Sequence, residues 1–458
     1  MGDPNPNPNP PHVLMLAYPA QGHVIPMMEL AQTLAKRGLK ITFVNSDLAH
    51  KRLIDALPDT GDAFPEEIRL VSIPDGLEKR EDRNVPGKLS AAISRVMPGK
   101  LEQLIREIGD EVTCLIADQS LGWGMEVGKK LGLKCAAFLP AAAAMRVLGL
   151  SIPKLIEQGI VKEDGTPVKN EVIQLSPSMP AMKTTDLVWA RFGSLEMQKA
   201  IFEAMVKNNE SGKLADRLIC NSTYSLEPGA FAMAPEIIPI GPLLARNRHG
   251  DSGGHFWPED STCLKWLDRQ ATQSVIYVAF GSLTTFNQTQ FQELALGLEL
   301  TNRPFLWVVQ PDITDRTKDW YPEGFLDRVR TRGKMSGWAP QQKVLSHPSV
   351  ACFVSHCGWN SVMEGVSNGV PFLCWPYFAD QFINQTYVCD VWMVGLGFER
   401  DEWGIVRGEE IQHKVEKLLG HTVFRERVLQ LKEETMASIA EGGCSNSNFN
   451  SFLEWIEA

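Results

Sequence analysis

The chain has 458 residues, a formal net charge of −10 at pH 7, 44% hydrophobic residues and 22% charged residues. This is an ordinary globular composition, and the length predicts two domains of about 200 residues each. The acidic balance argues against a nucleic-acid-binding protein, and no run reaches the roughly eighteen apolar residues of a membrane-spanning helix. Nine cysteines without a Cys-x-x-Cys pair favour reduced thiols and a cytoplasmic location. Residues 1–11, rich in Pro and Asn and without a signal-peptide pattern, are predicted to be a disordered lead.

Residues 12–46 show an apolar strand, a glycine-containing turn, a helix and a second strand, which is the pattern of a βαβ unit. Pro26 is expected where the helix opens and Gly38 where it closes. His23 then falls in the loop beyond the carboxyl end of the first strand, where open α/β sheets bind ligands. A histidine there is a candidate general base, because its unperturbed pKa is about 6.5. The alternative is a solvated loop histidine.

Asp118 follows the apolar run from Val112 to Ala117, so it also stands at the carboxyl end of a predicted strand. A carboxylate at such a position could hold the second ring nitrogen of a base histidine, fix its tautomer and stabilise the imidazolium. The alternative is an N-cap of the helix through Trp123, and both interpretations remain open.

The alternating pattern of the first half is interrupted by a stretch rich in proline, glycine and charge. We therefore predict a first Rossmann-like domain over 12–242, an interdomain linker over 243–262 and a second Rossmann-like domain over 263–437. The second domain restarts with a strand that ends in Gly281 and Ser282. The chain lacks GxGxxG and GxxxxGK[ST] motifs, which argues against a dehydrogenase and a P-loop protein.

Residues 338–381 are the most informative stretch of the chain. The run 350–356 is predicted to be a buried strand, and the helix that starts near Asn360 would present its backbone N–H groups to an anion such as a diphosphate. Within this stretch, polar and aromatic residues recur at loop positions and could bind the parts of a nucleotide-sugar. Trp338 offers a flat face to a base, Glu364 could accept hydrogen bonds from ribose hydroxyls, and Asp380 with Gln381 could bind a sugar.

Each of these residues also has a structural interpretation. Ser361 and Glu364 fit a capping box, His356 fits an ordinary strand-end histidine, Trp338 a core aromatic and Asp380 a helix N-cap. Taken singly, the structural interpretations are favoured, because short motifs match by chance. Taken together, at one spacing, the residues favour a nucleotide-sugar site.

The same stretch closely resembles the signature box of plant secondary-product UDP-glycosyltransferases, with Trp-Ala-Pro-Gln at its start, His-Cys-Gly-Trp-Asn-Ser at its centre and Asp-Gln at its end. His23 within Pro-Ala-Gln-Gly-His resembles the family's general base, Asp118 resembles its partner, and Gly281 with Ser282 resembles a glycine-serine turn near the phosphates. Leu283 stands where many relatives carry a small hydroxyl residue. The resemblance implies the α/β fold called GT-B, two facing Rossmann-like domains, with a C-terminal helix over 438–458 that packs back on the first domain.

The resemblance also implies the roles of the site residues. His23 and Asp118 would be catalytic. The residues implied in donor binding are Gly22, Gly281, Ser282, Trp338, Ala339, Gln341, His356, Gly358, Trp359, Asn360, Ser361, Glu364, Asp380 and Gln381.

The implied activity is an inverting transfer of a sugar from a UDP-sugar to a hydroxyl of a small hydrophobic acceptor, phenolic or terpenoid in type. Gln381 resembles the residue of glucose-preferring relatives, so UDP-glucose is the expected donor and a β-glucoside the expected product. Neither metal nor other cofactor is expected, and the protein is expected to be a monomer. The alternative is a catalytically silent nucleotide-sugar-binding protein. Apolar residues that could line an acceptor pocket, or simply form core, are Ala141–Ala144, Met145, Trp123, Trp189, Phe192 and Phe202.

Overall fold

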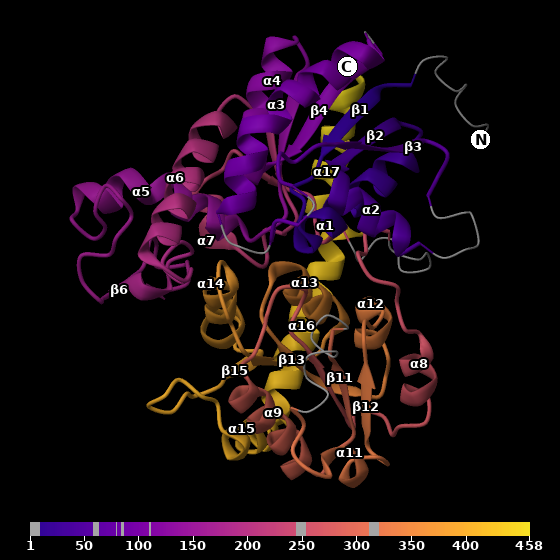
Figure 1. Cartoon of the computed structure of the whole chain (residues 1–458), viewed down its shortest axis with the longest axis vertical. Coiled ribbons are helices and arrows are strands. Elements are labelled where there is room, and N and C mark those ends of the chain that lie inside the picture. The colour runs from indigo at the N-terminus through magenta and orange to yellow at the C-terminus, as the bar shows by residue number, and fades with distance from the viewer. Residues whose placement is uncertain are drawn as a thin grey trace. The chain divides into compact units, whose positions relative to one another are not determined.

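The computed structural model describes residues 10–57, 64–78, 80–83, 87–109, 111–243, 253–310 and 320–458. The chain divides into two compact units (Figure 1). Unit 1 contains Met1–Met179, Lys183–Trp257 and Ser438–Ala458, and unit 2 contains Pro180–Met182 and Pro258–Ala437. Most of the predicted lead, residues 1–9, lies outside the described residues, as do residues 244–252 of the predicted linker.

Unit 1 is built on a parallel sheet, which has seven strands in the described residues. Its strand order is β3-β2-β1-β4-β5-β8-β9. The strands are β1 (His12–Leu16), β2 (Lys40–Ser46), β3 (Ile68–Ile73), β4 (Val112–Asp118), β5 (Lys134–Leu139), β8 (Arg217–Cys220) and β9 (Ile237–Pro239). The helices are α1 (Gln21–Ala35), α2 (Asp47–Asp55), α3 (Lys88–Ile108), α4 (Trp123–Lys130), α5 (Ala143–Glu157), α6 (Leu195–Gly212), α7 (Pro228–Met233) and α17 (Cys444–Glu457). Short elements are the 3₁₀ turns η1 (Gln119–Leu121) and η2 (Thr184–Asp186) and the strands β6 (Val172–Ile173) and β7 (Met182–Lys183).

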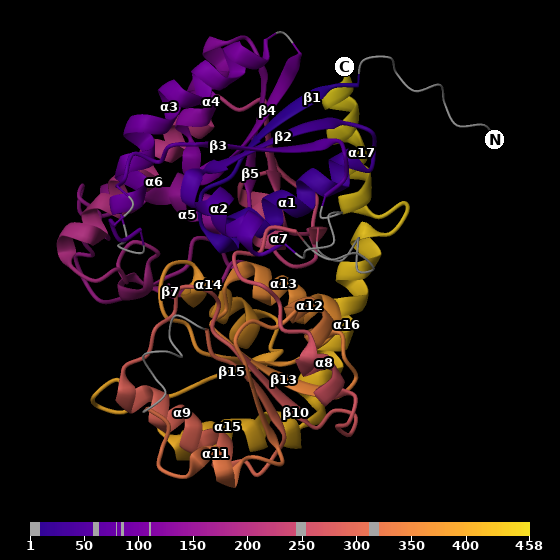
Figure 2. The same ribbon diagram turned by 45° about the vertical axis from the view of Figure 1, so that its right-hand side comes forward.

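Both faces of this sheet are covered, as the alternation of β1 shows. Val13 and Met15 belong to one buried cluster with residues of α1, α2 and α17, which we call the α1-side core. Leu14 and Leu16 belong to a second cluster with residues of α3 and α4. Successive strand side chains point to opposite faces, so an uninterrupted apolar strand is the expected sequence of a sheet covered on both sides. Figure 2 shows α17 alongside α1 and the sheet.

Unit 2 repeats this plan with six parallel strands among the residues described, in the order β12-β11-β10-β13-β14-β15. The strands are β10 (Val275–Ala279), β11 (Phe305–Val308), β12 (Gly333–Ser336), β13 (Val350–Ser355), β14 (Phe372–Cys374) and β15 (Gly395–Gly397). The helical elements are α8 (Thr262–Leu267), α9 (Gln288–Leu300), α11 (Phe325–Arg328), α12 (Gln341–Leu345), α13 (Trp359–Asn368), α14 (Gln381–Thr386), the π-helix η4 (Tyr387–Val391) and α15 (Gly408–Gly420). Helix α16 (Thr422–Ile439) contains the residue at which unit 2 ends.

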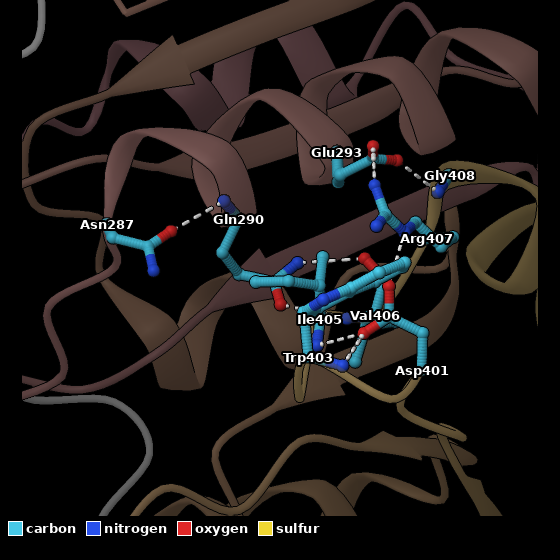
Figure 3. Close-up of polar contacts among 9 residues, drawn as sticks. All are labelled: Asn287, Gln290, Glu293, Asp401, Trp403, Ile405, Val406, Arg407 and Gly408. Carbon is cyan, nitrogen blue, oxygen red and sulfur yellow. Dashed lines mark hydrogen bonds and ion pairs between the residues drawn. The ribbon is translucent and has the colours of Figure 1, made fainter.

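One face of the second sheet is covered by α9 and α15, and polar contacts join these helices to the loop between β15 and α15 (Figure 3). The Gln290 side chain donates to the Val406 carbonyl and accepts from the Val406 N–H, both at 2.9 Å. The Arg407 guanidinium binds Glu293 at 3.0 Å and Asp401 at 2.6 Å. The side-chain amide of Gln290 thus replaces a strand partner for a buried piece of irregular backbone.

Two features of the predicted domain plan are located by the structure. One boundary between the units falls between Trp257 and Pro258, inside the range 243–262, and another falls between Ala437 and Ser438. Leu243 and Phe256, at either side of the undescribed part of that range, are buried in the α1-side core.

Among the residues described, no helix is long and apolar enough to cross a membrane. The two parallel sheets with helices on their faces confirm the predicted α/β class and two Rossmann-like domains.

Candidate active site and nucleotide-sugar site

The candidate residues gather where the strand order of each sheet reverses. In unit 1 the reversal lies between β1 and β4, and His23 follows β1 while Asp118 ends β4. In unit 2 it lies between β10 and β13, and Gly281 follows β10 while His356 follows β13. In open α/β sheets, ligands bind beyond the carboxyl ends of strands at this point, because the helices on the two sides diverge there.

His23 and Asp118 form a hydrogen-bonded pair. The Nδ1 of His23 lies 2.7 Å from Oδ2 of Asp118, and the exposed fraction is 32% for the histidine side chain and 0% for the aspartate side chain. A carboxylate only accepts hydrogen bonds, so Nδ1 carries the proton and Nε2 carries the lone pair. The histidine therefore has a proton-accepting Nε2, and the hydrogen bond to Asp118 fixes its tautomer.

The structure corrects the predicted position of His23. Helix α1 begins at Gln21, so His23 lies in its first turn and Pro26 lies inside the helix rather than at its start. The turn is already helical, because the N–H groups of His23 and Val24 both donate to the Ala20 carbonyl at 2.9 Å. Placement on a helix rather than in a loop restricts the direction in which the imidazole points.

Asp118 binds His23 and also caps a turn, although the turn is not the helix that it was predicted to cap. Its Oδ1 accepts from the Ser120 N–H at 2.8 Å and caps the short η1 turn, while Oδ2 holds His23. The helix through Trp123, which Asp118 was predicted to cap, begins after η1 and has Gly122 as its N-cap. The carboxylate is thus fixed by backbone on one oxygen and fixes the imidazole with the other.

Two neighbours of His23, Tyr18 and Gly22, lie close to it in the sequence. The Tyr18 ring centre lies 5.0 Å from the imidazole centre, and its hydroxyl is hydrogen-bonded to Ser90 at 2.9 Å. Burial raises the pKa of Tyr18, so its hydroxyl stays protonated at neutral pH. A Cβ on Gly22 would meet no heavy atom within 4 Å, so the space beside that backbone is open.

In unit 2, helix α13 begins at Trp359 with Gly358 as its N-cap, directly after β13 and His356. Cys357 has a φ of +64°, which turns the chain from strand into helix. The amino terminus of this ten-residue helix carries partial positive charge from the helix dipole, so it suits an anion.

His356 is enclosed by two glycines. A Cβ on Gly281 would lie 2.6 Å from its Nε2 and a Cβ on Gly358 would lie 2.5 Å from it, so neither position admits a side chain without displacing the ring. Burial lowers the pKa of His356 to about 4, so the imidazole is neutral near pH 7. Its Nδ1 is buried and finds no hydrogen-bond partner within the described part of the chain.

Gln341, Ser361 and Glu364 are joined by hydrogen bonds. The Nε2 of Gln341 donates to Ser361 Oγ at 2.9 Å and to Glu364 Oε2 at 2.6 Å, and its Oε1 accepts from the Tyr277 hydroxyl at 3.1 Å. The capping-box interpretation of Ser361 and Glu364 is wrong, because the N-cap is Gly358 and Ser361 lies inside the helix. Tyr277 escaped the sequence analysis; its only signal is a hydroxyl in an otherwise apolar strand.

The Asp380 and Gln381 side chains are bound within the protein. Asp380 is the N-cap of α14 but makes no capping bond with its side chain, which instead accepts from Asn384 at 2.8 Å. The Oε1 of Gln381 accepts from the N–H groups of Tyr377 at 2.7 Å and Phe378 at 3.1 Å. Gln381 therefore fixes the loop before it through its oxygen.

Four other residues implied in donor binding lie in or before helix α13. The Trp338 carbonyl accepts from the Asp260 N–H at 2.7 Å, and Ala339 is buried beside it. The Trp359 ring is also buried, with the ring centres of Tyr387 and Trp392 at 6.4 and 6.3 Å. Asn360 is the second residue of α13.

The turn after β10 holds a hydroxyl that the sequence analysis missed. Gly281 has a φ of +69°, and its carbonyl accepts from the Gln310 amide, next to Ser282. Leu283 is exposed, whereas Thr284 is buried and its hydroxyl has no hydrogen-bond partner among described residues. A small hydroxyl residue thus follows directly after Leu283.

Two residues suggested for an acceptor pocket are core. Trp189 and Phe202 are 1% and 2% exposed, their ring centres lie 5.0 Å apart, and the Trp189 Nε1 donates to the Gly165 carbonyl at 2.7 Å.

The residues that the structure describes contain no group of three or more His, Cys, Asp or Glu side chains that could hold a metal ion.

Comparisons with known proteins agree on one family. Residues 249–434 match the family model described as "UDP-glucoronosyl and UDP-glucosyl transferase". The chain is 48% identical to UDP-glycosyltransferase 83A1 of Arabidopsis thaliana, with 98% of this chain and 97% of the relative covered. The crystal structure of Os79 from O. sativa in complex with UDP matches with a TM-score of 0.81 and 26% identity, over 97% of this chain and 100% of the other.

A second solved structure is Phytolacca americana UGT2 complexed with UDP-2fluoro-glucose and pterostilbene. It matches with a TM-score of 0.80 and 25% identity, over 98% of this chain and 100% of the other. The fold is therefore GT-B, and the enzyme class follows from the relatives that match over nearly the whole chain. The chain belongs to the plant UDP-glycosyltransferases, enzymes that transfer a sugar from a UDP-sugar to a small-molecule acceptor.

Proposed function

We propose that this enzyme transfers glucose from UDP-glucose to a hydroxyl of a small hydrophobic acceptor, phenolic or terpenoid in type, with inversion to a β-glucoside. The observation that carries the proposal is the 2.7 Å contact between His23 and the fully buried Asp118. A buried carboxylate that is hydrogen-bonded to a partly exposed imidazole is the arrangement of a general base with its orienting group. In this proposal residues 12–242 bind the acceptor and residues 263–437 bind the donor.

The proposed reaction is a direct displacement at the anomeric carbon. The Nε2 of His23 takes the hydroxyl proton of the acceptor as the oxygen attacks, and the bond to the UDP oxygen breaks on the opposite face. Asp118 stabilises the imidazolium that forms, since its negative charge lies 2.7 Å from Nδ1. Without that carboxylate, the protonated state of His23 would lose its main counter-charge.

On the donor side, the departing diphosphate would meet the amino terminus of α13, where the helix dipole places partial positive charge. His356, neutral because burial lowers its pKa to about 4, would act as a hydrogen-bond donor rather than as a cation. The hydroxyls of Ser282 and Thr284, on the turn after β10, are candidates for further phosphate contacts. Fixed dipoles of this kind stabilise developing charge without reorganising.

The choice of glucose is supported by Gln381 and by a relative of known structure. With Oε1 used by two backbone N–H groups, Gln381 offers its Nε2 as a donor to sugar hydroxyls, beside the acceptor oxygens of Asp380. The donor analogue bound by P. americana UGT2 is UDP-2fluoro-glucose, a glucose derivative. We further propose a monomer, and a location in the cytosol, where a reducing environment would keep all nine cysteines as free thiols.

The test is a mass-spectrometric screen of the purified enzyme with UDP-glucose and a mixed panel of flavonoid, terpenoid and simple phenolic acceptors. A gain of one hexose on an acceptor is expected with the wild type and not with His23→Ala. Product with UDP-galactose alone would replace glucose in the proposal. Binding of UDP-glucose without product or hydrolysis would favour a silent nucleotide-sugar-binding protein instead.

A further inference from the structure

Tyr277 lies outside residues 338–381 but connects the core of unit 2 to them. It is the third residue of β10, 1% exposed, and its ring stacks on Phe353 with the centres 5.0 Å apart. Its neighbours along the strand, Ile276 and Val278, belong to the α9-side core, the buried cluster of unit 2 that includes residues of α9 and α15. Strand alternation therefore points Tyr277 to the opposite face, where its hydroxyl meets Gln341 at the start of α12.

The directions of the hydrogen bonds in this group follow from chemistry. Glu364, 7% exposed, can only accept as a carboxylate, so the amide nitrogen of Gln341 must face it. The amide oxygen of Gln341 then faces Tyr277, whose hydroxyl must donate. Burial raises the pKa of Tyr277 well above its usual range, and the charge of Glu364 adds to this, so the donating proton is retained.

Both N–H donors of Gln341 are used within the protein, one by Ser361 at 2.9 Å and one by Glu364 at 2.6 Å. The amide is therefore better suited to hold Glu364 than to donate to a ligand. Glu364 sets the orientation of this amide, and the Tyr277 hydroxyl anchors the amide in that position by donating to its oxygen.

We infer that Tyr277 is a positioning residue for the donor: through Gln341 it fixes the Glu364 carboxylate in the direction that receives the ribose hydroxyls of a UDP-sugar. The inference rests on the proposed function, in which Glu364 accepts from the ribose. Tyr277 itself touches no part of the donor in this arrangement. Its effect should appear as selectivity for the ribose and not as a change in the chemical step.

The experiment uses Tyr277→Phe, which removes one oxygen and keeps the stacked ring. Calorimetry with UDP and with deoxyuridine diphosphate, which lacks the 2′-hydroxyl, reports the ribose contact directly. We expect wild type to bind UDP more tightly than deoxyuridine diphosphate. The variant should bind UDP roughly two- to tenfold more weakly, the effect of one buried hydrogen bond, with a smaller loss for the deoxy ligand. In turnover, KM for UDP-glucose should rise by the same factor while kcat changes less than about twofold.

The matched control is Tyr321→Phe, a hydroxyl removed from a partly buried tyrosine of unit 2 that packs on the α9-side core. This control should leave both affinities unchanged. In a Glu364→Gln background, adding Tyr277→Phe should change the ratio of the two affinities no further, because the group being positioned is already altered.

Equal losses for UDP and deoxyuridine diphosphate in Tyr277→Phe, or no loss for either, would overturn the inference while wild-type transfer activity leaves the proposed function intact. Wild-type protein that binds both ligands equally would overturn the ribose assignment of Glu364 and this inference with it.

Discussion

Single residues decide the two ends of the proposed reaction. His23 is partly exposed and bonded to a buried Asp118, whereas His356 is enclosed between Gly281 and Gly358. In the proposed reaction, histidine therefore has two roles: a proton acceptor in one unit and a neutral hydrogen-bonding group in the other. Burial accounts for the neutral state of His356, because desolvation disfavours the imidazolium.

Replacement of His23 by alanine should separate catalysis from donor binding. We expect kcat to fall by about 10²-fold or more, since the acceptor hydroxyl loses its base, while the affinity for UDP-glucose stays within about twofold. Initial rates and calorimetry on the same preparation measure both quantities. Turnover near the wild-type level in a folded variant would remove His23 as the base.

Gly281→Ala should weaken donor binding beyond what backbone strain explains. The added Cβ meets His356 Nε2 at 2.6 Å at a φ of +69°. The control is Gly404→Ala, also in unit 2, with a φ of +78° and nothing within 4 Å of the new Cβ. Both variants should lose about 1 kcal/mol of folding stability or slightly more from the left-handed conformation. Only Gly281→Ala should lose UDP affinity, and equal affinities in the two variants would contradict the packing described for His356.

At the scale of elements, side chains substitute for regular backbone pairing around β15 and α15. Gln290 on α9 satisfies both the N–H and the carbonyl of Val406, and both groups are buried. Arg407, by contrast, binds Glu293 and Asp401 with a 40% exposed side chain. Exposed ion pairs contribute little, whereas unsatisfied buried backbone groups are costly.

Gln290→Leu should therefore lower the unfolding free energy by about 2 to 4 kcal/mol, since two buried backbone groups lose their partners. Arg407→Gln should cost less than about 1 kcal/mol. Denaturant titration of the two variants beside the wild type measures the difference. A larger loss for Arg407→Gln would show that the ion pairs, and not the amide contacts, hold this loop.

The element scale also shows what the sequence could predict. The strands that end before Gly281 and His356 and the helix that starts near Asn360 follow from the sequence pattern, and the structure confirms them. The start of α1 was predicted too late, because Pro26 resembles a helix opening and the first turn from Gln21 carries no capping side chain. The role of Gln341 was incomplete for a different reason: its partner Tyr277 comes from a strand 64 residues away, and no local pattern reports such a contact.

At the scale of the whole molecule, each unit contains a partly buried histidine that resists protonation. Burial lowers the pKa of His255 in unit 1 to about 4, as it does for His356 in unit 2. A histidine whose folded pKa lies below its unfolded value of about 6.5 binds its proton more readily when unfolded. The stability that it provides is complete above pH 6.5 and is lost as the pH falls towards 4.

The thermal unfolding midpoint should consequently fall as the pH is lowered from 7 to 4.5, with an uptake of up to about one proton per histidine of this pair on unfolding. His255→Asn should reduce the pH dependence of unit 1 and leave that of unit 2 unchanged. Calorimetry in buffers of different ionisation enthalpy counts the protons. An unchanged pH dependence in His255→Asn would mean that His255 is protonated in the folded state.

The α1-side core contains Val13 and Met15 from the first strand together with Phe449, Phe452 and Ile456 from α17. Roughly four hundred residues of synthesis separate these two contributions, which amounts to tens of seconds at ribosomal speeds. During that interval the apolar stripe that α17 later covers is exposed on the nascent chain, where it is a surface for chaperones to bind. The first unit to be synthesised is therefore the last to be completed. A stop codon before Phe449 would leave the α1-side core without its α17 residues, so the apolar stripe would stay uncovered.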